Sequence, residues 1–293
     1  MHIRETGWAS RLFDVFNILL MLGVIFVTVF PFYWMTIVSF SDGNAVIRGD
    51  VGLWPVKPTL ESYRLIFTDP AIPRSLMNSV LYTTLGTFIS LSMTALCAYP
   101  LSRTRFCGKG VFTAIIAFTM FFSGGLIPLY LQVVRLGIRD TMWALILPFA
   151  INVWYMFIMR TAFKDIHEEI YDAAIVDGAN ELQIFLRIAL PLAKPILATM
   201  LLFYAVEYWN DYFNALIFLD DRAKWPIQII LRNIVLLGRF EMQGELAGTS
   251  AFLAVEQTLR YATIMVSTLP ILVVYPFVQR YFVKGAMIGA IKE

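Results

Sequence analysis

Long apolar segments alternate with short polar segments along most of the chain. Six of the apolar segments are long enough for a helix to cross the hydrocarbon core of a bilayer, which takes about 20 residues. No series of short alternating strands that would close into a barrel is present. The pattern therefore predicts an all-α integral membrane protein in which residues 1–293 form a single transmembrane domain. The predicted spans are approximately 13–38, 78–101, 111–134, 141–163, 195–219 and 262–283.

The distribution of basic residues predicts how these spans are oriented. The short loop after the second span contains Arg103, Arg105 and Lys109 and no acidic residue. Such loops are typical of the cytoplasmic side. The loop between spans three and four carries two arginines and weakly favours the opposite orientation. Because six spans leave both termini on one side, we predict cytoplasmic termini, with segments 39–77 and 220–260 outside.

The two outer segments are too long to be simple turns. Segment 39–77 is predicted to be compact and irregular, because several prolines interrupt it. These prolines are Pro55, Pro58, Pro70 and Pro73. Segment 220–260 contains WPIQIILRNIVLLGRF, which predicts a short helix lying on or near the membrane. That helix either packs in the interface or docks an external partner, and its pattern leaves both interpretations open.

Composition supports the membrane assignment. The chain is 59% hydrophobic and 15% charged, whereas soluble domains are about a quarter charged. A formal net charge of +2 gives no indication of a nucleic-acid partner. Cys97 and Cys107 are too few to form a disulfide framework.

No constellation of catalytic or metal-binding residues is recognisable in the sequence. His167 and Glu168 begin HEEIY, but Tyr171 stands where a zincin helix needs its second histidine. GKG at 108–110 lacks the glycine spacing and the following Ser or Thr of a phosphate loop. We therefore predict that the protein is not an enzyme, holds no metal or cofactor, and does not hydrolyse ATP by itself.

A patterned polar insert, EEIYDAAIVDGANELQIFLRIALPLAKP, separates the fourth and fifth predicted spans. Gly178 permits a left-handed helix stop, and Asn180 is suited to cap a second helix. The insert therefore predicts a helix, a sharp turn and a second helix on the cytoplasmic face. Residues expected on the apolar side of the first helix are Ile170, Ala173, Ala174, Ile175 and Val176. Residues expected to be exposed are Glu168, Glu169, Asp172 and Asp177.

The spacing within this insert resembles the cytoplasmic signature of ABC importer permeases. That signature is Glu-Ala-Ala, three residues, Gly, nine residues, Ile, one residue and Leu-Pro. Here Asp replaces the first Glu, which keeps the charge on a shorter side chain. The matching residues are Asp172, Ala173, Ala174, Gly178, Ile188, Leu190 and Pro191.

The resemblance implies that the segment at about 165–191 contains a coupling helix. In that family this helix lies in a groove of a separate ATP-binding subunit and transmits its closure to the spans. The implied partners are a homologous second permease, two ATP-binding subunits that bind ATP and Mg, and an extracytoplasmic solute-binding protein, assembled in lipid of the bacterial inner membrane. The implied coupling residues are the matching residues together with Glu169.

Other stretches resemble particular branches of the same family. WNDYFNALIFL and YPFVQRYFVKGAMIGAIKE look like the carbohydrate branch. GGLIPLYLQVVRLGIRDTMWALILP looks like the subgroup that carries larger oligosaccharides or polysaccharides, alginate importers among them. The resemblance therefore implies a permease subunit of an ATP-driven oligosaccharide or polysaccharide importer.

The fifth predicted span carries a polar stripe. Glu207, Asp211 and Asn214 follow a helical spacing, with Asn210 beside them. The stripe either lines the translocation path or forms interhelical hydrogen bonds that fix packing. In the first case the flat rings of nearby aromatic residues would contact sugar rings. These aromatic residues are Tyr204, Tyr208 and Trp209. An alternative function is an ion-coupled secondary transporter or channel that uses Glu207 and Asp211.

Overall fold

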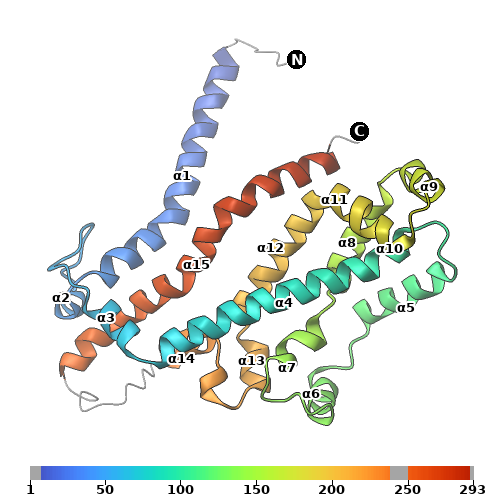
Figure 1. The fold of residues 1–293 in the computed structure, drawn as a ribbon. Coiled ribbons are helices and arrows are strands. Elements are labelled where there is room, and N and C mark those ends of the chain that lie inside the picture. The colour runs from blue at the N-terminus through green and yellow to red at the C-terminus, as the bar shows by residue number, and fades with distance from the viewer. Residues whose placement is uncertain (1–7, 238–249, 291–293) are drawn as a thin grey trace. The chain divides into compact units, whose positions relative to one another are not determined.

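The structure is a computed structural model that describes residues 8–237 and 250–290. Within these residues every regular element is a helix (Figure 1). The described chain divides into two compact units, residues 8–69 with 250–266 and residues 70–237 with 267–290. The all-α prediction is therefore confirmed.

The first unit contains helices α1 (Trp8–Ser39), α2 (Gly43–Arg48) and α3 (Glu61–Thr68) and the beginning of α15 (Ser250–Ala290). Its core gathers around Ile37, Val38 and Ala45. The two short helices α2 and α3 correct the expectation of an irregular segment 39–77. Residues 49–60 between them, which include two of the prolines, form the longest irregular stretch of the segment.

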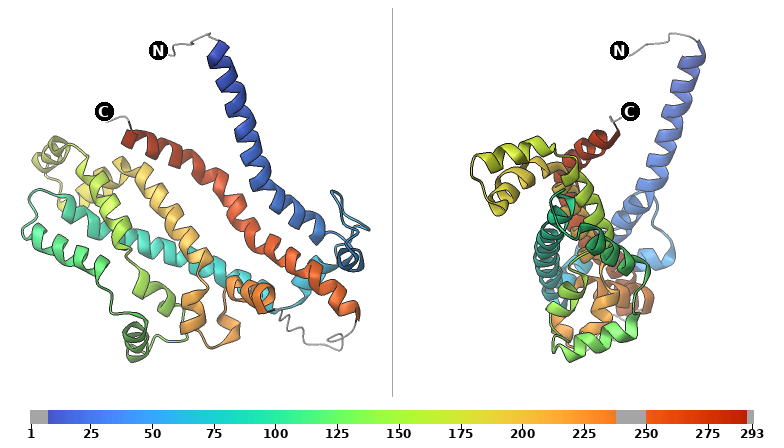
Figure 2. Two further views of the ribbon diagram at one scale, coloured as in Figure 1. Left: turned by 180° about the vertical axis from the view of Figure 1, so that it is seen from behind. Right: turned by 90° about the vertical axis from the view of Figure 1, so that its right-hand side faces the viewer.

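Helix α4 (Ala71–Ser102) is the central element of the second unit. Helices α8 (Val153–Lys164) and α12 (Lys194–Asn210) pack along it (Figure 2). Pro70 and Pro73 were predicted to interrupt regular structure, but they lie at the start of α4. The first turn of a helix tolerates proline because its N–H groups have no partner within the helix.

Shorter helices connect these three. Before α8 lie α5 (Lys109–Phe121), α6 (Leu126–Arg135), α7 (Trp143–Ile146) and η1 (Leu147–Phe149). Between α8 and α12 lie α9 (Glu168–Val176), α10 (Glu181–Ile184), the π-helical turn η2 (Phe185–Ala189) and α11 (Leu190–Leu192). After α12 lie α13 (Phe213–Phe218), η3 (Arg222–Lys224) and α14 (Ile227–Leu237). Helix α14 matches the short helix predicted in segment 220–260, of which residues 238–249 lie outside the described chain.

Three of the described helices contain a stretch long and apolar enough to cross a membrane. These stretches are Ser10–Ser39, Ala71–Ser102 and Val255–Pro276. Three pairs of bent helices pass the same test when each pair is taken as one span. The described chain therefore accommodates up to six spans, and the count of six stays a prediction.

The structure interrupts two predicted spans with sharp bends. Helices α5 and α6 meet at 113°, where Gly125 adopts a positive φ of 85° that glycine reaches without steric cost. The α7–η1 segment and α8 meet at 52°, where Asn152 Oδ1 accepts hydrogen bonds from the first N–H groups of α8. Neither 111–134 nor 141–163 is therefore one continuous helix.

The fifth predicted span, 195–219, is also broken. Helix α12 ends at Asn210 and α13 begins at Phe213. Between them, Asp211 Oδ1 accepts a hydrogen bond from the backbone N–H of Asn214 at 3.1 Å. A carboxylate that satisfies a free N–H at a helix start favours a new helix over continuation of the old one.

Candidate functional site

The candidate coupling segment (165–191) folds as two short helices joined by a tight turn, as predicted. Gly178 has a φ of +82°. Its N–H donates to the carbonyl of Ile175, and the N–H of Ala179 donates to the carbonyl of Ala174, each at 3.0 Å. This pair of bonds is the Schellman arrangement, which satisfies the last carbonyls of α9 and requires a left-handed residue between them.

Asn180 caps the second helix, which confirms the expectation for this residue. Asn180 Oδ1 accepts from the N–H of Gln183 at 2.8 Å. In return, Gln183 Oε1 accepts from the N–H of Asn180 at 3.0 Å. This capping box fixes the direction of α10 directly after the turn. The helical run Glu181–Leu192 then meets α12 at an angle of 82°.

Helix α9 is anchored through a face that the sequence pattern did not predict. Tyr171 and Ala174 are buried in the core cluster of the second unit. Ile170 and Val176, expected on the apolar side, are 40% and 85% exposed, and Ala173 is exposed as well. The expected apolar side was therefore wrong for three of its five residues. The signal missed was Tyr171, which precedes Ala174 by three residues and so shares its face.

Two acidic residues of α9 form ion pairs with the loop after α4. Glu168 Oε1 lies 3.2 Å from Arg103 Nη1, and Asp172 Oδ1 accepts from Arg105 Nη2 at 2.8 Å. Neither arginine was predicted as a site residue. Glu169 is exposed, and its side chain forms no ion pair with another described residue. The carboxylate that replaces the signature glutamate is thus held within this chain.

Burial determines the electrostatics in the first turn of α9. Tyr171 is 1% exposed, and this desolvation raises the pKa of its hydroxyl, while the nearby Arg103 cation acts in the opposite direction. The hydroxyl therefore stays neutral, which suits its buried position. The guanidinium carbon of Arg103 lies 3.8 Å from the centre of the Tyr171 ring, within cation–π distance.

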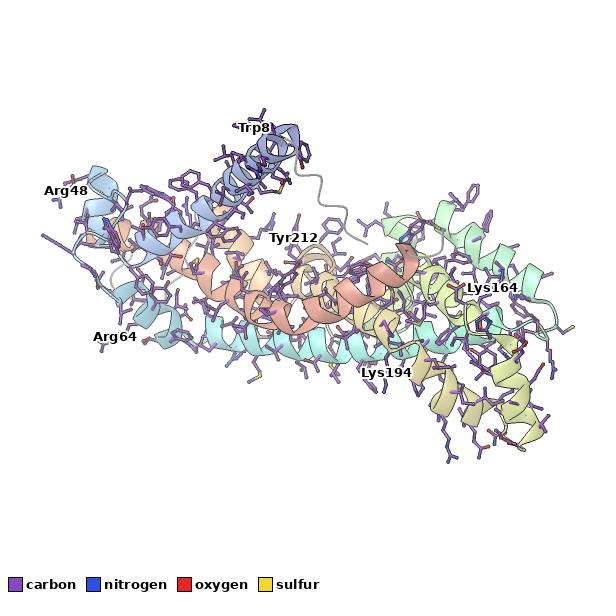
Figure 3. The ribbon with its side chains drawn as sticks, turned by 90° about the horizontal axis from the view of Figure 1, so that it is seen from above. Trp8, Arg48, Arg64, Lys164, Lys194 and Tyr212 are labelled. Atoms are coloured by element: carbon purple, nitrogen blue, oxygen red, sulfur yellow. The ribbon has the colours of Figure 1, made fainter. Side chains whose placement is uncertain are left out.

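The remaining signature residues lie near the return to the membrane. Ile188 and Leu190 are partly buried and pack against the same core cluster, whereas Pro191 is exposed. Lys164, at the end of α8, and Lys194, at the start of α12, lie on either side of the candidate coupling segment in Figure 3. The structure therefore leaves the outer faces of α9 and α10 uncovered by the described part of this chain.

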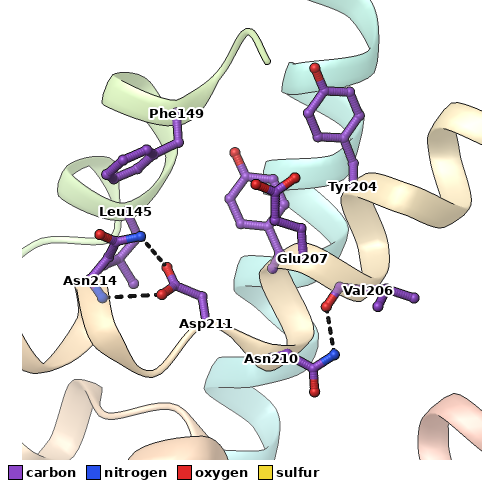
Figure 4. Close-up of a pocket in the computed structure, with 9 residues that line it drawn as sticks. Leu145, Phe149, Tyr204, Val206, Glu207, Asn210, Asp211 and Asn214 are labelled. Carbon is purple, nitrogen blue, oxygen red and sulfur yellow. Dashed lines mark hydrogen bonds between the residues drawn. The ribbon is translucent and has the colours of Figure 1, made fainter. Parts of the chain in front are cut away.

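A second candidate site is a cleft of about 360 Å³ at the break between α12 and α13 (Figure 4). Glu207, Asp211 and Asn214 meet there although the helix between them is interrupted. Asn214 Nδ2 donates to Asp211 Oδ2 at 3.1 Å. Asn210 also borders the cleft, but its Nδ2 donates back to Val206 in the same helix at 2.8 Å. The other lining residues are Leu145, Phe149, Tyr204, Val206 and Tyr208.

The aromatic residues near the cleft serve mainly to hold helices together. Tyr204 and Tyr208 are nearly buried, and their hydroxyls bond to Thr94 at 2.6 Å and Ser90 at 2.8 Å on α4. Trp209 is absent from the cleft lining, and its Nε1 donates to the carbonyl of Ser267 at 3.1 Å. The packing interpretation thus describes the contacts of these three residues better than a flat sugar platform does.

The cleft has the chemistry to hold a hydroxyl-rich molecule. Carboxylate and amide oxygens accept hydrogen bonds from hydroxyl groups, and Asn side chains donate as well. Phe149 and Leu145 add apolar wall. Among the described residues that line the cleft none is basic. Its polar character therefore comes from two carboxylates and two amides.

Comparison with known proteins identifies the family. No family model matches the chain. It is 41% identical over 294 residues to the protein LplC of Bacillus subtilis (strain 168). That alignment covers 100% of this chain and 99% of LplC. It is 43% identical over 286 residues to the polygalacturonan/rhamnogalacturonan transport system permease protein YtcP of the same organism, with 97% and 99% coverage.

A solved structure gives the same answer. The fold superposes with a TM-score of 0.88 and 35% identity on a chain from the crystal structure of a bacterial ABC transporter that imports the acidic polysaccharide alginate. The match covers 94% of this chain and 98% of the other. This chain is thus a transport subunit and not an enzyme. On similarity that extends along its whole length, this chain belongs to the carbohydrate branch of the ABC importer permeases.

Proposed function

We propose that this permease passes an oligosaccharide or polysaccharide across the bacterial inner membrane, and that α9 is its coupling helix. The observation that carries the proposal is that Ala173 lies exposed on the outer face of α9, a short helix that ends at the left-handed turn of Gly178. An exposed small side chain allows another protein surface to approach closely. The cargo class is supported by the named substrates of YtcP and of the alginate transporter.

The proposed assembly contains a homologous second permease, two ATP-binding subunits that hold ATP and Mg, and an extracytoplasmic solute-binding protein. Helix α9 would contact the ATP-binding subunit, so the coupling segment and both termini would be cytoplasmic. The basic loop that holds α9, with Arg103 and Arg105, supports this orientation. The remaining residues that the family signature implies are proposed to act with Ala173, the exposed ones at the contact and the buried Ala174 by holding α9 against the core. These are Glu169, Asp172, Ala174, Ile188, Leu190 and Pro191.

We assign the cleft formed by Glu207, Asp211 and Asn214 to the translocation path. Its support is that carboxylate and amide groups meet in one opening although the helix is interrupted between them. The ion-coupled alternative for Glu207 and Asp211 is not retained, because the relatives are ABC permeases. The carboxylates would instead contact sugar hydroxyls during passage.

Reconstitution tests the whole proposal. The chain is co-expressed with its partner permease and ATP-binding subunits, purified, and inserted into liposomes. Oligosaccharides from polygalacturonan and from alginate, presented on the solute-binding protein, should accumulate only when ATP is supplied. Uptake by this chain alone, driven by an ion gradient without ATP, would contradict the proposal. A purified chain that never retains an ATP-binding subunit would contradict it as well.

A further inference from the structure

The contact between α4 and α9 depends on an arginine in an unusual environment. Arg103 is the residue directly after α4, and its side chain is only 6% exposed, whereas the side chain of Arg105 is 62% exposed. Charged side chains are rarely buried so deeply unless they are paired. Arg103 therefore needs a structural reason to lie inside, and its contacts supply one.

Among the described residues, the side chain of Arg103 contacts α9 and the last turns of α4. Its guanidinium stacks over Tyr171, lies beside Glu168, and is 6.0 Å from the ring centre of Tyr99. A planar guanidinium forms an ion pair and stacks on a ring at the same time, which an ammonium group does not do. Arg103 thus joins the charged and the aromatic anchors of α9 in one contact.

The carbonyl groups at the end of α4 are satisfied by other cations. Lys109 Nζ donates to the carbonyls of Ser102 at 3.2 Å and Arg103 at 3.1 Å. Arg160 Nε donates to the carbonyl of Leu101 at 2.9 Å. The side chain of Arg103 is therefore not required to cap its own helix, and its burial is explained by α9.

Helix α4 also contacts two tyrosines that line the cleft, although no α4 residue lines it itself. It is unbroken from Ala71 to Ser102, and its hydroxyl side chains at Ser90 and Thr94 bond to the two tyrosines at the cleft wall. Tyr99, one turn before Arg103, donates to Glu181 Oε2 at the start of α10 at 2.9 Å. One continuous helix thus holds both short helices of the coupling segment at one end and the cleft wall along its middle.

We propose that Arg103 is a positioning residue that makes α9 and α4 move together, so that displacement of α9 reaches the tyrosines of the cleft through α4. The inference rests on the proposed function of α9, because it needs a subunit that displaces this helix. Specifically, the displacement of α9 is transmitted to α4, which contains the second predicted span, and not only to α12. Arg103 itself touches neither ATP nor saccharide.

The test compares Arg103→Gln with the wild type in the reconstituted complex. The measured quantity is the ratio of ATP hydrolysis with and without saccharide-loaded binding protein. The saccharide is the polygalacturonan or alginate oligosaccharide that wild-type complex takes up. We expect the ratio to fall about fivefold or more. Arg48→Gln, which removes an exposed arginine that forms an ion pair with Asp50, should leave the ratio as in the wild type.

A second variant covers the case in which Arg103→Gln prevents assembly. Arg103→Lys keeps a charge beside Glu168 but loses the planar stack, so an intermediate ratio is expected. A spin label on Val176→Cys, with Cys97 and Cys107 replaced by alanine, should report larger motion of α9 in both variants. An assembled Arg103→Lys complex with a wild-type ratio and wild-type label motion would overturn the inference. Failure of wild-type complex to bind ATP-binding subunits would instead overturn the proposed function.

Discussion

Gly86 on α4 lies against the phenol ring of Tyr208 on α12. A Cβ atom at position 86 would come within 2.8 Å of that ring, closer than side chains pack. One turn further along α4, Ser90 Oγ lies 2.8 Å from the Tyr208 hydroxyl. The absent side chain and the buried hydrogen bond together set the spacing between these two helices.

Gly86→Ala should therefore destabilise the protein by about 1–3 kcal/mol, because the added methyl group overpacks a buried contact. The measurement is the thermal unfolding midpoint of the purified complex in detergent. Gly23→Ala on α1 is the matched control, since no atom of the described residues outside its own helix turn lies within 4 Å of a Cβ atom there. Adding Tyr208→Leu to Gly86→Ala should recover part of the loss. A Gly86→Ala protein as stable as the control would show that the helices separate freely.

Gly178→Pro should uncouple transport from ATP hydrolysis. Proline fixes φ near −65°, whereas Gly178 has a φ of +82°, and proline also removes the N–H that donates to Ile175. The turn would then misdirect α9 relative to α10. ATP hydrolysis stimulated by loaded binding protein should be lost in reconstituted complex.

Gly178→Asn separates backbone strain from side-chain bulk. Asparagine adopts positive φ more readily than other residues with a side chain. In the described part of the chain no non-neighbouring atom lies within 4 Å of a Cβ atom at this position. Stimulation should therefore be largely retained by Gly178→Asn and lost by Gly178→Leu. Equal activity of all three variants would mean that the left-handed turn has no part in coupling.

Asp140 ties the loop after α6 to the loop after α13. It has a φ of +55°, its Oδ1 accepts from the N–H groups of Asp220 and Asp221 at 3.0 Å each, and Lys224 Nζ donates to its Oδ2. The bond from Lys224, followed by the backbone bonds, holds the pKa of the Asp140 carboxyl below its usual value. The charged form is therefore favoured by folding.

This direction gives a pH dependence with a definite sign. A lowered folded pKa stabilises the protein above the unfolded pKa, about 3.9, and the stabilisation is lost as the pH falls through the folded value. The difference in unfolding midpoint between wild type and Asp140→Asn should thus be constant near neutral pH and shrink below about pH 4. Asparagine is chosen because it tolerates the positive φ. A difference that stays constant down to pH 3 would contradict the assignment.

The features that were predicted correctly from sequence depend on neighbouring residues. The left-handed turn at Gly178 and the cap at Asn180 follow from backbone preferences and from hydrogen bonds that span three to five residues. The break at Asp211 is equally local, but an apolar run continues past it. The periodicity therefore predicts one helix, because a hydropathy pattern contains no information on the hydrogen bond from the N–H of Asn214 to the Asp211 carboxylate.

The buried face of α9 was missed for a different reason. Tyr171 lies inside because its ring meets that of Tyr99, 6.3 Å away between ring centres, and because Arg103 covers it. Both partners are distant in sequence, at the end of another helix. Periodicity ranks a tyrosine in a polar segment below isoleucine and valine, although here Ile170 and Val176 face outward. Tertiary contacts, not helix propensity, decided which side was buried.

Asp211 has two separable roles, a helix cap and a charge in the cleft. Asp211→Leu removes both, leaves the N–H of Asn214 without its acceptor, and should cost about 1 kcal/mol of stability. Asp211→Asn keeps the cap and removes only the charge. We expect complex yield to fall for Asp211→Leu alone, and saccharide uptake to fall for both. Normal uptake by Asp211→Asn would show that the carboxylate charge is not needed in the cleft.

Ala173 and Ala174 are neighbours with opposite surroundings. Ala174 is 8% exposed and belongs to the core cluster with Tyr171 and Phe163. Ala173 is exposed on the outer face of α9. Of these two residues, only Ala173 lies where α9 would contact an ATP-binding subunit. A bulky side chain at position 173 should therefore affect that contact, whereas one at position 174 should affect the core of this chain.

Ala173→Trp should leave this chain folded and paired with its partner permease. Overpacking should weaken binding of the ATP-binding subunit by about 1–3 kcal/mol, which is roughly a tenfold to hundredfold loss of affinity. Ala174→Trp should instead lower the unfolding midpoint of the chain itself, because the added ring has no room in the core. The measurement is the subunit ratio after purification, together with the unfolding midpoint of each variant.

Ala173→Cys, in a background without Cys97 and Cys107, should cross-link to the ATP-binding subunit. Cross-linking to the solute-binding protein would overturn both the coupling role of α9 and the cytoplasmic orientation, since the two partners occupy opposite sides of the membrane.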